Sequence, residues 1–298
     1  MEKIRKNKKV IAVFLIPAVL IYLCFELIPV VMSVYFSFND WPGLQAVPLK
    51  FVGFKNYSNL FHNAVFLKSL QNVLIYVVVS VILQVPIGFG LGLLIHHFKK
   101  GQRFFKAAFF IPMILSVTAV ALLWNFIYFP TDKGILNSLL IKIGLGNYIQ
   151  QWLVNPKTSL ICLIVVSTWT SVGYYMIICL AGLTSIPDSV LEAGELDGAT
   201  GWKKIWNLYI PMLWEPLKMS TIMVITGVLK IFDTVYILTP TGGTSNCTIV
   251  PALLMYNEAY RYGHYGTGSA IATVIFVLSA AVSIFRLKLM NQKESIEY

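Results

Sequence analysis

The sequence predicts an all-α polytopic membrane protein with six transmembrane helices, and three observations support this fold class. Of the 298 residues, 57% are hydrophobic and 12% are charged, whereas a soluble domain carries roughly 25% charged residues. Several apolar runs reach the ~20 residues that a helix needs to cross the hydrocarbon core of a bilayer. Their hydrophobicity is continuous, whereas the strands of a membrane barrel alternate apolar and polar residues.

The six expected spans follow from these runs in chain order: about 10–36, 71–95, 104–128, 158–183, 217–239 and 266–289. Prolines inside them are tolerated because neighbouring helices satisfy the freed backbone groups. The first run follows a basic stretch, as in a signal peptide. It is longer than the apolar region of about 7–15 residues that a signal peptide has, and it lacks a clear cleavage site. We therefore expect a retained signal-anchor.

The distribution of Lys and Arg predicts the orientation, because cytoplasmic loops are enriched in these residues. About twice as many of them fall on the N-terminal side of the membrane as on the opposite side. We therefore expect a cell-membrane protein with both termini in the cytoplasm. The expected parts are a basic cytoplasmic tail 1–9, a first span 10–36, an extracellular segment 37–70, a membrane core 71–289 and a cytoplasmic tail 290–298.

Charge and cysteine content exclude several other classes of protein. The net charge of +10 is explained by the positive-inside topology, so we expect no nucleic-acid partner. Cys24, Cys162 and Cys179 fall in expected spans and Cys247 in an external loop, without the spacing of metal ligands. We expect small buried residues there and no metal site. The sequence also shows no Ser/His/Asp set, so we expect no catalytic residues and no enzyme.

The polar segment 184–216, which separates two spans and is expected in the cytoplasm, predicts two short helices. Ser185 and Asp188 match a capping box, and a helix is expected from there to Leu196, before Gly198 breaks it. A second helix, ended by Pro211, would place four apolar residues on one face: Trp202, Ile205, Trp206 and Tyr209. Two surface helices held at the lipid interface by the tryptophans would show the same pattern.

The spacing within this segment resembles the EAA loop of ATP-binding-cassette (ABC) importer permeases, which reads E-A-A, three residues, G, nine residues, I-x-L-P. Here Glu192-Ala193-Gly194 is followed after three residues by Gly198, after nine more by Leu208, and then by Ile210-Pro211. Gly194, Leu208 and Ile210 depart from the family pattern. Asp197-Gly198-Ala199 is similar to the D-G-A form of the carbohydrate-uptake branch. Four further motifs extend the resemblance over about 70–290: Thr168-Trp169, 182–187, 232–239 with Gly242-Gly243, and 265–272.

The resemblance implies a type I ABC importer permease fold in which this segment is a coupling helix docked on a cytoplasmic ATPase. The docking residues that it implies are Glu192, Ala193, Gly194, Asp197, Gly198 and Ala199. The chain has no G-x-x-x-x-G-K-[ST] loop to hold nucleotide phosphates. We therefore expect no cofactor in this chain, with ATP and Mg²⁺ bound by two ATPase subunits. The other expected partners are a second, related permease subunit in a heterodimer, an extracellular solute-binding protein and membrane lipid.

Two clusters in the spans are expected to line the solute pathway. Buried charge is costly in hydrocarbon, so Asp233 is expected to face a cavity together with Phe232 and Tyr236. A structural ion pair with Lys230, three residues earlier on the same helix face, is the alternative. The outer end of the third span offers an amide and aromatic faces in a region similar to one that contacts sugar in maltose-type permeases: Asn125, Tyr128 and Phe129. An interfacial aromatic belt is the alternative for this cluster.

We therefore expect the transmembrane subunit of an ATP-driven importer that moves a sugar or oligosaccharide from an extracellular binding protein into the cytoplasm by alternating access. An importer of glycerol-phosphate or another small polar solute is an alternative. A phosphate ester would favour basic residues in the cavity, where Lys230 is the single candidate, so a neutral sugar is preferred. An ion-coupled secondary transporter, with Lys230 and Asp233 as its coupling site, is a further alternative.

Overall fold

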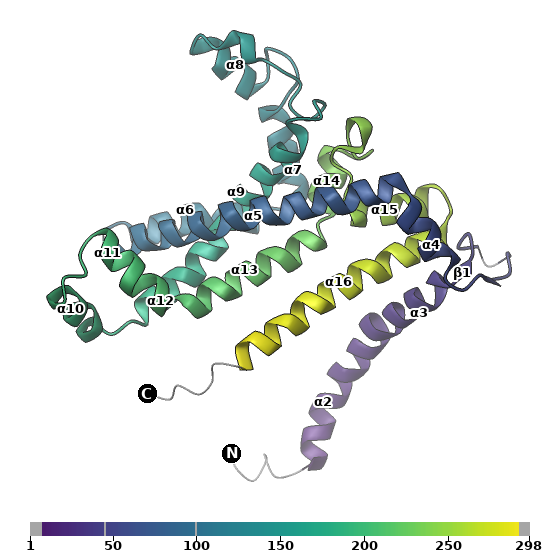
Figure 1. The fold of residues 1–298 in the computed structure, drawn as a ribbon, viewed down its shortest axis with the longest axis horizontal. Helices are drawn as coiled ribbons and strands as arrows, with labels where there is room; N and C mark the ends of the chain where they lie inside the picture. Colours follow the sequence, from purple (N-terminus) through teal and green to yellow (C-terminus); the bar gives the residue numbers. More distant parts are fainter. Residues whose placement is uncertain (1–7, 45, 99, 292–298) are drawn as a thin grey trace. The chain divides into compact units, whose positions relative to one another are not determined.

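The computed structural model describes residues 8–44, 46–98 and 100–291, and these residues form mostly helices (Figure 1). Residues 1–7 and 292–298, which make up most of the two predicted tails, lie outside the described residues. The α-helices are α2 (Lys8–Tyr22), α3 (Ile28–Ser37), α4 (Lys55–His62), α5 (Ala64–His97), α6 (Gln102–Ile114), α7 (Val117–Ile127), α8 (Ile135–Lys142), α9 (Ser159–Thr184), α10 (Asp188–Leu196), α11 (Trp202–Lys204), α12 (Ile210–Met212), α13 (Trp214–Leu229), α14 (Asp233–Leu238), α15 (Pro251–Tyr256) and α16 (Tyr265–Asn291).

Short turns and strands complete the fold. The π-helical turns are η1 (Leu23–Leu27), η3 (Ile205–Tyr209) and η5 (Asn257–Arg261), and the 3₁₀ turns are η2 (Gly146–Tyr148) and η4 (Thr244–Asn246). Strands β1 (Asn39–Asp40) and β2 (Lys50–Phe51) pair antiparallel, with Asn39 opposite Phe51.

Four helical stretches are long and apolar enough to cross a membrane: Val13–Ser37, Ala64–His97, Ser159–Thr184 and Tyr265–Ile284. Two bent helix pairs meet the same criteria when each is taken as one span. They are Gln102–Ile114 with Val117–Ile127, bent by 98°, and Trp202–Met212 with Trp214–Leu229, bent by 73°. Four of the predicted spans therefore correspond to unbroken stretches and the third to a bent pair, whereas the other bent pair overlaps the predicted fifth span, 217–239, only through α13.

The predicted third span, 104–128, is broken between α6 and α7. Leu115 adopts an extended conformation, and Ser116 begins the new helix as its N-cap. The Ser116 hydroxyl accepts a hydrogen bond from the N–H of Ala119 at 3.2 Å. A serine cap of this kind satisfies one of the donors left open at a helix start, which stabilises the break inside an apolar run.

The predicted fifth span, 217–239, is broken as well. The helix α13 ends at Leu229, and α14 starts at Asp233. Lys230 is the C-cap of α13, while Asp233 lies in the first turn of α14. A cation at a helix C-terminus and a carboxylate at a helix N-terminus both suit the helix dipole. The two charges therefore lie at opposite sides of a helix break and do not share one continuous helix face.

The described chain divides into two compact units. One comprises the residues up to Asn63 with Leu254–Phe276, and the other comprises Ala64–Leu253 with the residues from Val277 on. In the first unit, the Asn56 amide nitrogen donates hydrogen bonds to the carbonyls of Ser37 and Asn39 at 2.8 and 2.9 Å. These bonds fix α4 against the strand that follows α3.

In the second unit, α5 and α9 form the centre of the packing, with α13 against α5 and α6 against α9 (Figure 1). The close approach of α5 and α9 depends on Gly88 and Gly92, which form a small-xxx-small pattern on α5. A Cβ at Gly88 would lie 2.8 Å from Cβ of Tyr175, and one at Gly92 would lie 3.2 Å from Cβ of Cys179. Small residues of this spacing allow helix backbones to pack closely in a membrane.

Candidate functional site

A pocket of about 220 Å³ lies in the second unit, beside the break between α6 and α7 and the break between α13 and α14. It is lined by side chains from α5, α7, α9 and α13, and by Ile231 and Thr234 beside the second break. Val117 and Val120 come from the first turns of α7, directly after the first break. Interrupted helices at membrane depth are accommodated where they line a cavity or are buried in protein. The two breaks that the sequence did not predict therefore share one pocket.

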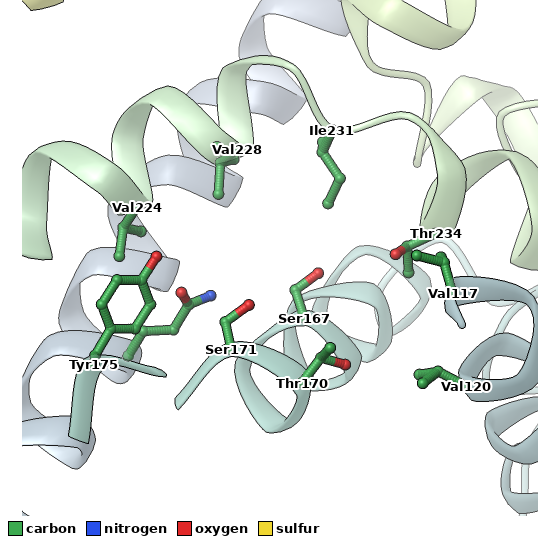
Figure 2. Close-up of a pocket in the computed structure, with 12 residues that line it drawn as sticks. Val117, Val120, Ser167, Thr170, Ser171, Tyr175, Val224, Val228, Ile231 and Thr234 are labelled. Carbon is green, nitrogen blue, oxygen red and sulfur yellow. The ribbon is translucent and has the colours of Figure 1, made fainter. Parts of the chain in front are cut away.

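The polar side of this pocket comes mainly from α9. Ser167, Ser171 and Tyr175 recur at intervals of four residues and form one stripe along the helix. Figure 2 shows the hydroxyls of Ser167 and Ser171 pointing from α9 into the space opposite Val228 and Ile231. The Ser167 hydroxyl also hydrogen-bonds with the buried Tyr76 hydroxyl, which fixes its orientation.

The chemistry of the pocket is polar but uncharged. Its polar groups are the amide of Gln84, which is 2% exposed, and the hydroxyls of α9 and Thr234. The Thr170 hydroxyl donates to the carbonyl of Val166 at 2.8 Å, and the remaining wall is formed by valines, Ile231 and glycine. Hydroxyls and an amide both donate and accept hydrogen bonds. Such a lining suits a neutral solute that carries hydroxyl groups.

The predicted pathway residues of the third span lie in a different pocket. Asn125, Tyr128 and Phe129 line an apolar pocket of about 370 Å³ together with residues of the 151–154 loop. Tyr128 is buried, and its ring packs 5.1 Å from the ring of Trp124. Trp124 in turn meets Trp169 edge to face at 5.8 Å. Tyr128 is thus part of a packed aromatic cluster, whereas Phe129 is 46% exposed.

The other predicted pathway cluster borders the polar pocket without lining it. The rings of Phe232 and Tyr236 stack at 5.1 Å, and Asp233 is exposed at the start of α14. Their neighbours Ile231 and Thr234 are the residues of this segment that line the pocket. The sequence analysis missed Gln84, Ser167 and Ser171, although polar residues at helical spacing within an apolar span were a usable signal.

The predicted coupling segment forms α10, a sharp turn, and α11. Pro187 is the N-cap of α10. The predicted capping box is not formed, because the Ser185 hydroxyl donates to the carbonyl of Gly182 at 2.7 Å. The helix ends at Leu196 as predicted.

The turn after α10 explains the glycine of the Asp197-Gly198-Ala199 sequence. Gly198 has a φ of +80°. Its N–H donates to the carbonyl of Glu195 at 3.0 Å, and the N–H of Ala199 donates to the carbonyl of Gly194 at 2.9 Å. This is the Schellman pattern, which needs a left-handed residue after the helix. A Cβ at Gly198 would meet nothing within 4 Å, so the backbone conformation and not the available space requires glycine.

One side of α10 packs against the rest of the second unit, and the other side is exposed. Val190 and Leu191 pack against a cluster that includes Leu183 and Leu213, at the end of α9 and beside the start of α13. The opposite side of the segment exposes Leu196 and four of the predicted docking residues: Glu192, Ala193, Asp197 and Gly198. Leu196 is 90% exposed.

Two contacts tie α10 to the elements that follow. Lys204 donates from Nζ to Oε1 of Glu195 at 2.6 Å, and this hydrogen bond raises the pKa of Lys204. A Cβ at Gly194 would lie 3.2 Å from Cδ2 of Leu208. Gly194 and Leu208, which both depart from the family pattern, therefore face each other. The small residue at 194 leaves room for the branched side chain at 208.

The second helix of the segment differs from the prediction. It is interrupted by the π-helical turn η3, and Pro211 lies inside α12 instead of ending the helix. Trp202, Ile205 and Trp206 share one groove, whereas Tyr209 packs with α10 against the cluster around Leu213. The wider π turn changes the predicted face, because its residues advance by more than 3.6 per turn.

Comparison with known protein families gives one match that covers most of the chain. Residues 84–294 match the family described as the binding-protein-dependent transport system inner membrane component. The matched region begins within α5, at Gln84, and includes the polar pocket and α10.

Individual relatives and solved structures agree with this match. The chain is 36% identical to the probable ABC transporter permease YurN of Bacillus subtilis (strain 168), covering 96% of this chain and 97% of YurN. It is 32% identical to the lactose transport system permease LacF of Rhizobium radiobacter, covering 91% and 90%. Its fold matches a chain of the bacterial alginate ABC transporter in complex with an alginate pentasaccharide-bound periplasmic protein, with a TM-score of 0.83, 20% identity and coverage of 100% and 99%. The chain therefore belongs to the inner-membrane permeases of binding-protein-dependent ABC transporters.

Proposed function

We propose that this permease carries a neutral sugar or oligosaccharide through the polar pocket between α5, α9 and the two helix breaks. The observation that carries this proposal is the pocket's lining, where hydroxyl and amide groups stand beside aliphatic side chains without a charged residue. Hydroxyl-rich solutes form hydrogen bonds with such groups, and their C–H surfaces contact apolar walls. The relative LacF is named for lactose, and the similar structure is of an alginate transporter.

A phosphorylated solute is less compatible with this lining. Arg and Lys are the side chains that bind phosphate with charge-assisted hydrogen bonds, whereas the residues of the polar pocket are uncharged. Lys230, the residue considered for such a role, is exposed at the C-terminal end of α13. The sugar proposal is therefore favoured over the glycerol-phosphate alternative.

The energy for transport is proposed to enter through α10. Its exposed side, with Glu192, Ala193 and Leu196, would dock on a separate cytoplasmic ATPase that binds ATP and Mg²⁺. Its buried side packs through Val190 and Leu191 on the end of α9, and α9 carries the polar stripe of the pocket. A displacement of α10 would thus be passed along α9 to the pocket, because packed cores are bistable and not continuously deformable.

The proposed assembly contains this chain, a related second permease, two ATPase subunits and an extracellular solute-binding protein. In the proposed orientation, both termini and α10 lie in the cytoplasm, and the loops 37–70, 129–157 and 240–265 meet the binding protein. Alternating access would then open the pocket first to the binding protein and next to the cytoplasm.

The proposal is tested by reconstituting the complex into liposomes and measuring uptake of labelled sugars together with ATP hydrolysis. We expect uptake that requires both ATP and the cognate binding protein, and ATP hydrolysis that rises when the sugar is added. Uptake by this chain alone, without ATPase and binding protein, would contradict the proposal and favour a secondary transporter. Uptake of a sugar phosphate in place of the neutral sugar would contradict the proposed solute class.

A further inference from the structure

We propose that a groove between α5 and residues 202–221 binds one membrane phospholipid, with an acyl chain along the groove and an anionic headgroup beside the lysines of residues 202–221. Residues 202–221, which run from α11 to the middle of α13, are called the elbow below. This site is separate from the polar pocket and from the exposed side of α10, and it does not depend on the identity of the solute.

The size of the groove fits an acyl chain. Its volume is about 730 Å³. Along α5, its lining extends from Val85 to Leu94, which is about 14 Å at ~1.5 Å per residue. The hydrocarbon core of a bilayer is ~30 Å thick, so one leaflet is about half of that. The groove is therefore about as long as one leaflet is thick.

The lining of the groove is that of a hydrocarbon site. Apart from Thr221 and the indole N–H groups of three tryptophans, its lining is apolar. The Thr221 hydroxyl donates to the carbonyl of Leu217 at 2.9 Å, so this hydroxyl is already satisfied. At Gly90 the groove floor is open, because a Cβ there would meet nothing within 4 Å. A flexible alkyl chain fills such a space without leaving a polar group unpaired.

The elbow has the geometry and composition of a membrane interface. Its first part, Trp202–Met212, is bent by 73° from α13, so it lies near the membrane plane when α13 crosses the bilayer. Three tryptophans of the elbow line the groove: Trp202, Trp206 and Trp214, which are 76%, 64% and 48% exposed. Tryptophan is enriched at membrane–water interfaces because its ring is amphipathic. The elbow is therefore placed at headgroup level, with the groove extending from it into the leaflet.

Two lysines provide the charge for an anionic headgroup. Lys203 is exposed next to Trp202, and the Lys218 ammonium lies 5.9 Å from the ring centre of Trp214. Lys218 also pairs with Glu215, with the lysine side chain 21% exposed and the glutamate side chain 60% exposed. Lys204 is held by Glu195 on α10. Basic residues beside a membrane span attract anionic lipids, each contributing about fivefold in affinity.

The first test measures lipid retention by native mass spectrometry of the whole transporter complex, purified in nanodiscs of phosphatidylcholine with phosphatidylglycerol. We expect the wild type to retain phosphatidylglycerol. Gly90→Phe, which fills the open groove floor, should lose it, whereas Ile82→Phe adds bulk to an exposed position of α5 outside the groove and should retain it. Lys203→Gln and Lys218→Gln should each lower the preference for phosphatidylglycerol about fivefold. Equal retention by Gly90→Phe and wild type would overturn the proposal.

A second measurement does not depend on the stability of a groove variant. A benzophenone side chain in place of Trp206 should, on illumination in the same nanodiscs, form an adduct with the mass of a phospholipid. An adduct with another protein subunit would overturn the proposal, because the groove would then be a subunit interface. Both readouts are independent of solute uptake, so a failure here leaves the proposed transport function untouched.

Discussion

Lys204 and Glu195 join the two arms of the coupling segment, with Nζ of the lysine 2.6 Å from Oε1 of the glutamate. The glutamate belongs to the last turn of α10 and the lysine to α11, so the contact bridges the turn at Gly198. Because Glu195 is more than half exposed, the pair adds little to stability, with typical values of ~0–1 kcal/mol for surface pairs. Its expected role is to hold the angle between the two arms.

We predict that Lys204→Gln lowers the amount of solute transported per ATP hydrolysed and leaves the melting temperature of the complex nearly unchanged. The reason is that a neutral side chain loses the ion pair but keeps the packing of its aliphatic stem. Uptake and ATP hydrolysis measured together in proteoliposomes check this, with Lys142→Gln, at an exposed lysine of α8, as the control. A loss of both activities in equal proportion would contradict it.

The pH dependence of this contact follows from the pKa of Lys204, which the bond to Glu195 raises. A lysine whose pKa is raised by folding contributes its stabilisation below the unfolded pKa and loses it as the pH rises through the folded pKa. The contribution of this pair should therefore be constant from about pH 6 to 9 and fall only above the usual lysine range. The measurement is the amount of solute transported per ATP hydrolysed, compared between the wild type and Lys204→Gln across that pH range. A change in their ratio near neutral pH would contradict this role of the Lys204–Glu195 pair.

We predict that Gly198→Ala weakens coupling although there is room for the methyl group. Placing an L-residue in the left-handed conformation costs ~1–2 kcal/mol, and the penalty falls on the turn that ends α10. Gly198→Asn should recover part of the loss, because asparagine tolerates this conformation better than alanine. Solute-stimulated ATP hydrolysis should be highest in the wild type, lower in Gly198→Asn and lowest in Gly198→Ala. Full activity of the alanine variant would rule out a need for the left-handed turn.

Leu196 is predicted to be an anchor for the ATPase. Burying a leucine side chain is worth ~1.5–3 kcal/mol, so Leu196→Ala should weaken binding of the ATPase subunit by roughly tenfold or more. The affinity of the purified permease for the ATPase checks this. Leu145→Ala removes an equally large exposed side chain between α8 and η2 and should leave that affinity unchanged. Equal binding by wild type and Leu196→Ala would place the docking contact elsewhere.

Gly88 and Gly90 provide a matched pair for the packing of α5 on α9. A Cβ at Gly88 would lie 2.8 Å from Cβ of Tyr175, whereas one at Gly90 would meet nothing within 4 Å. Gly88→Ala should therefore destabilise by ~1–3 kcal/mol through overpacking, while Gly90→Ala should stabilise slightly through higher helix propensity. Thermal unfolding of the purified complex distinguishes them. The same melting temperature for both variants would contradict the close packing.

The sequence was sufficient to predict the apolar spans, the end of α10 at Leu196 and a helix break at Gly198, because each depends on local composition or backbone conformation. It was not sufficient for the helix breaks at Leu115–Ser116 and Lys230–Phe232. Both lie within apolar runs, where hydropathy is the same for a straight and a broken helix. At the first break the Ser116 cap satisfies an opened backbone donor, and at the second the charges of Lys230 and Asp233 suit the dipoles of the two helix ends.

None of the residues predicted to line the solute pathway lines the polar pocket. Aromatic and charged residues such as Tyr128 and Asp233 stand out in an apolar sequence, and they received the pathway prediction. The hydroxyls of Ser167 and Ser171 are common in membrane helices and carry little signal one at a time. They form a polar surface only because they lie four residues apart on one face of α9, and because Gln84 of α5 lines the same pocket.

The central claim, that the polar pocket is the solute pathway, is tested most directly by Ser171→Leu. The measurement is the initial rate of ATP-driven sugar uptake in proteoliposomes, with Ile82→Leu on the exposed side of α5 as the control. We predict that Ser171→Leu lowers uptake at least tenfold while binding of the ATPase stays normal, because the leucine fills the pocket and removes a hydroxyl. Uptake at the wild-type rate by a normally assembled Ser171→Leu complex would contradict the account.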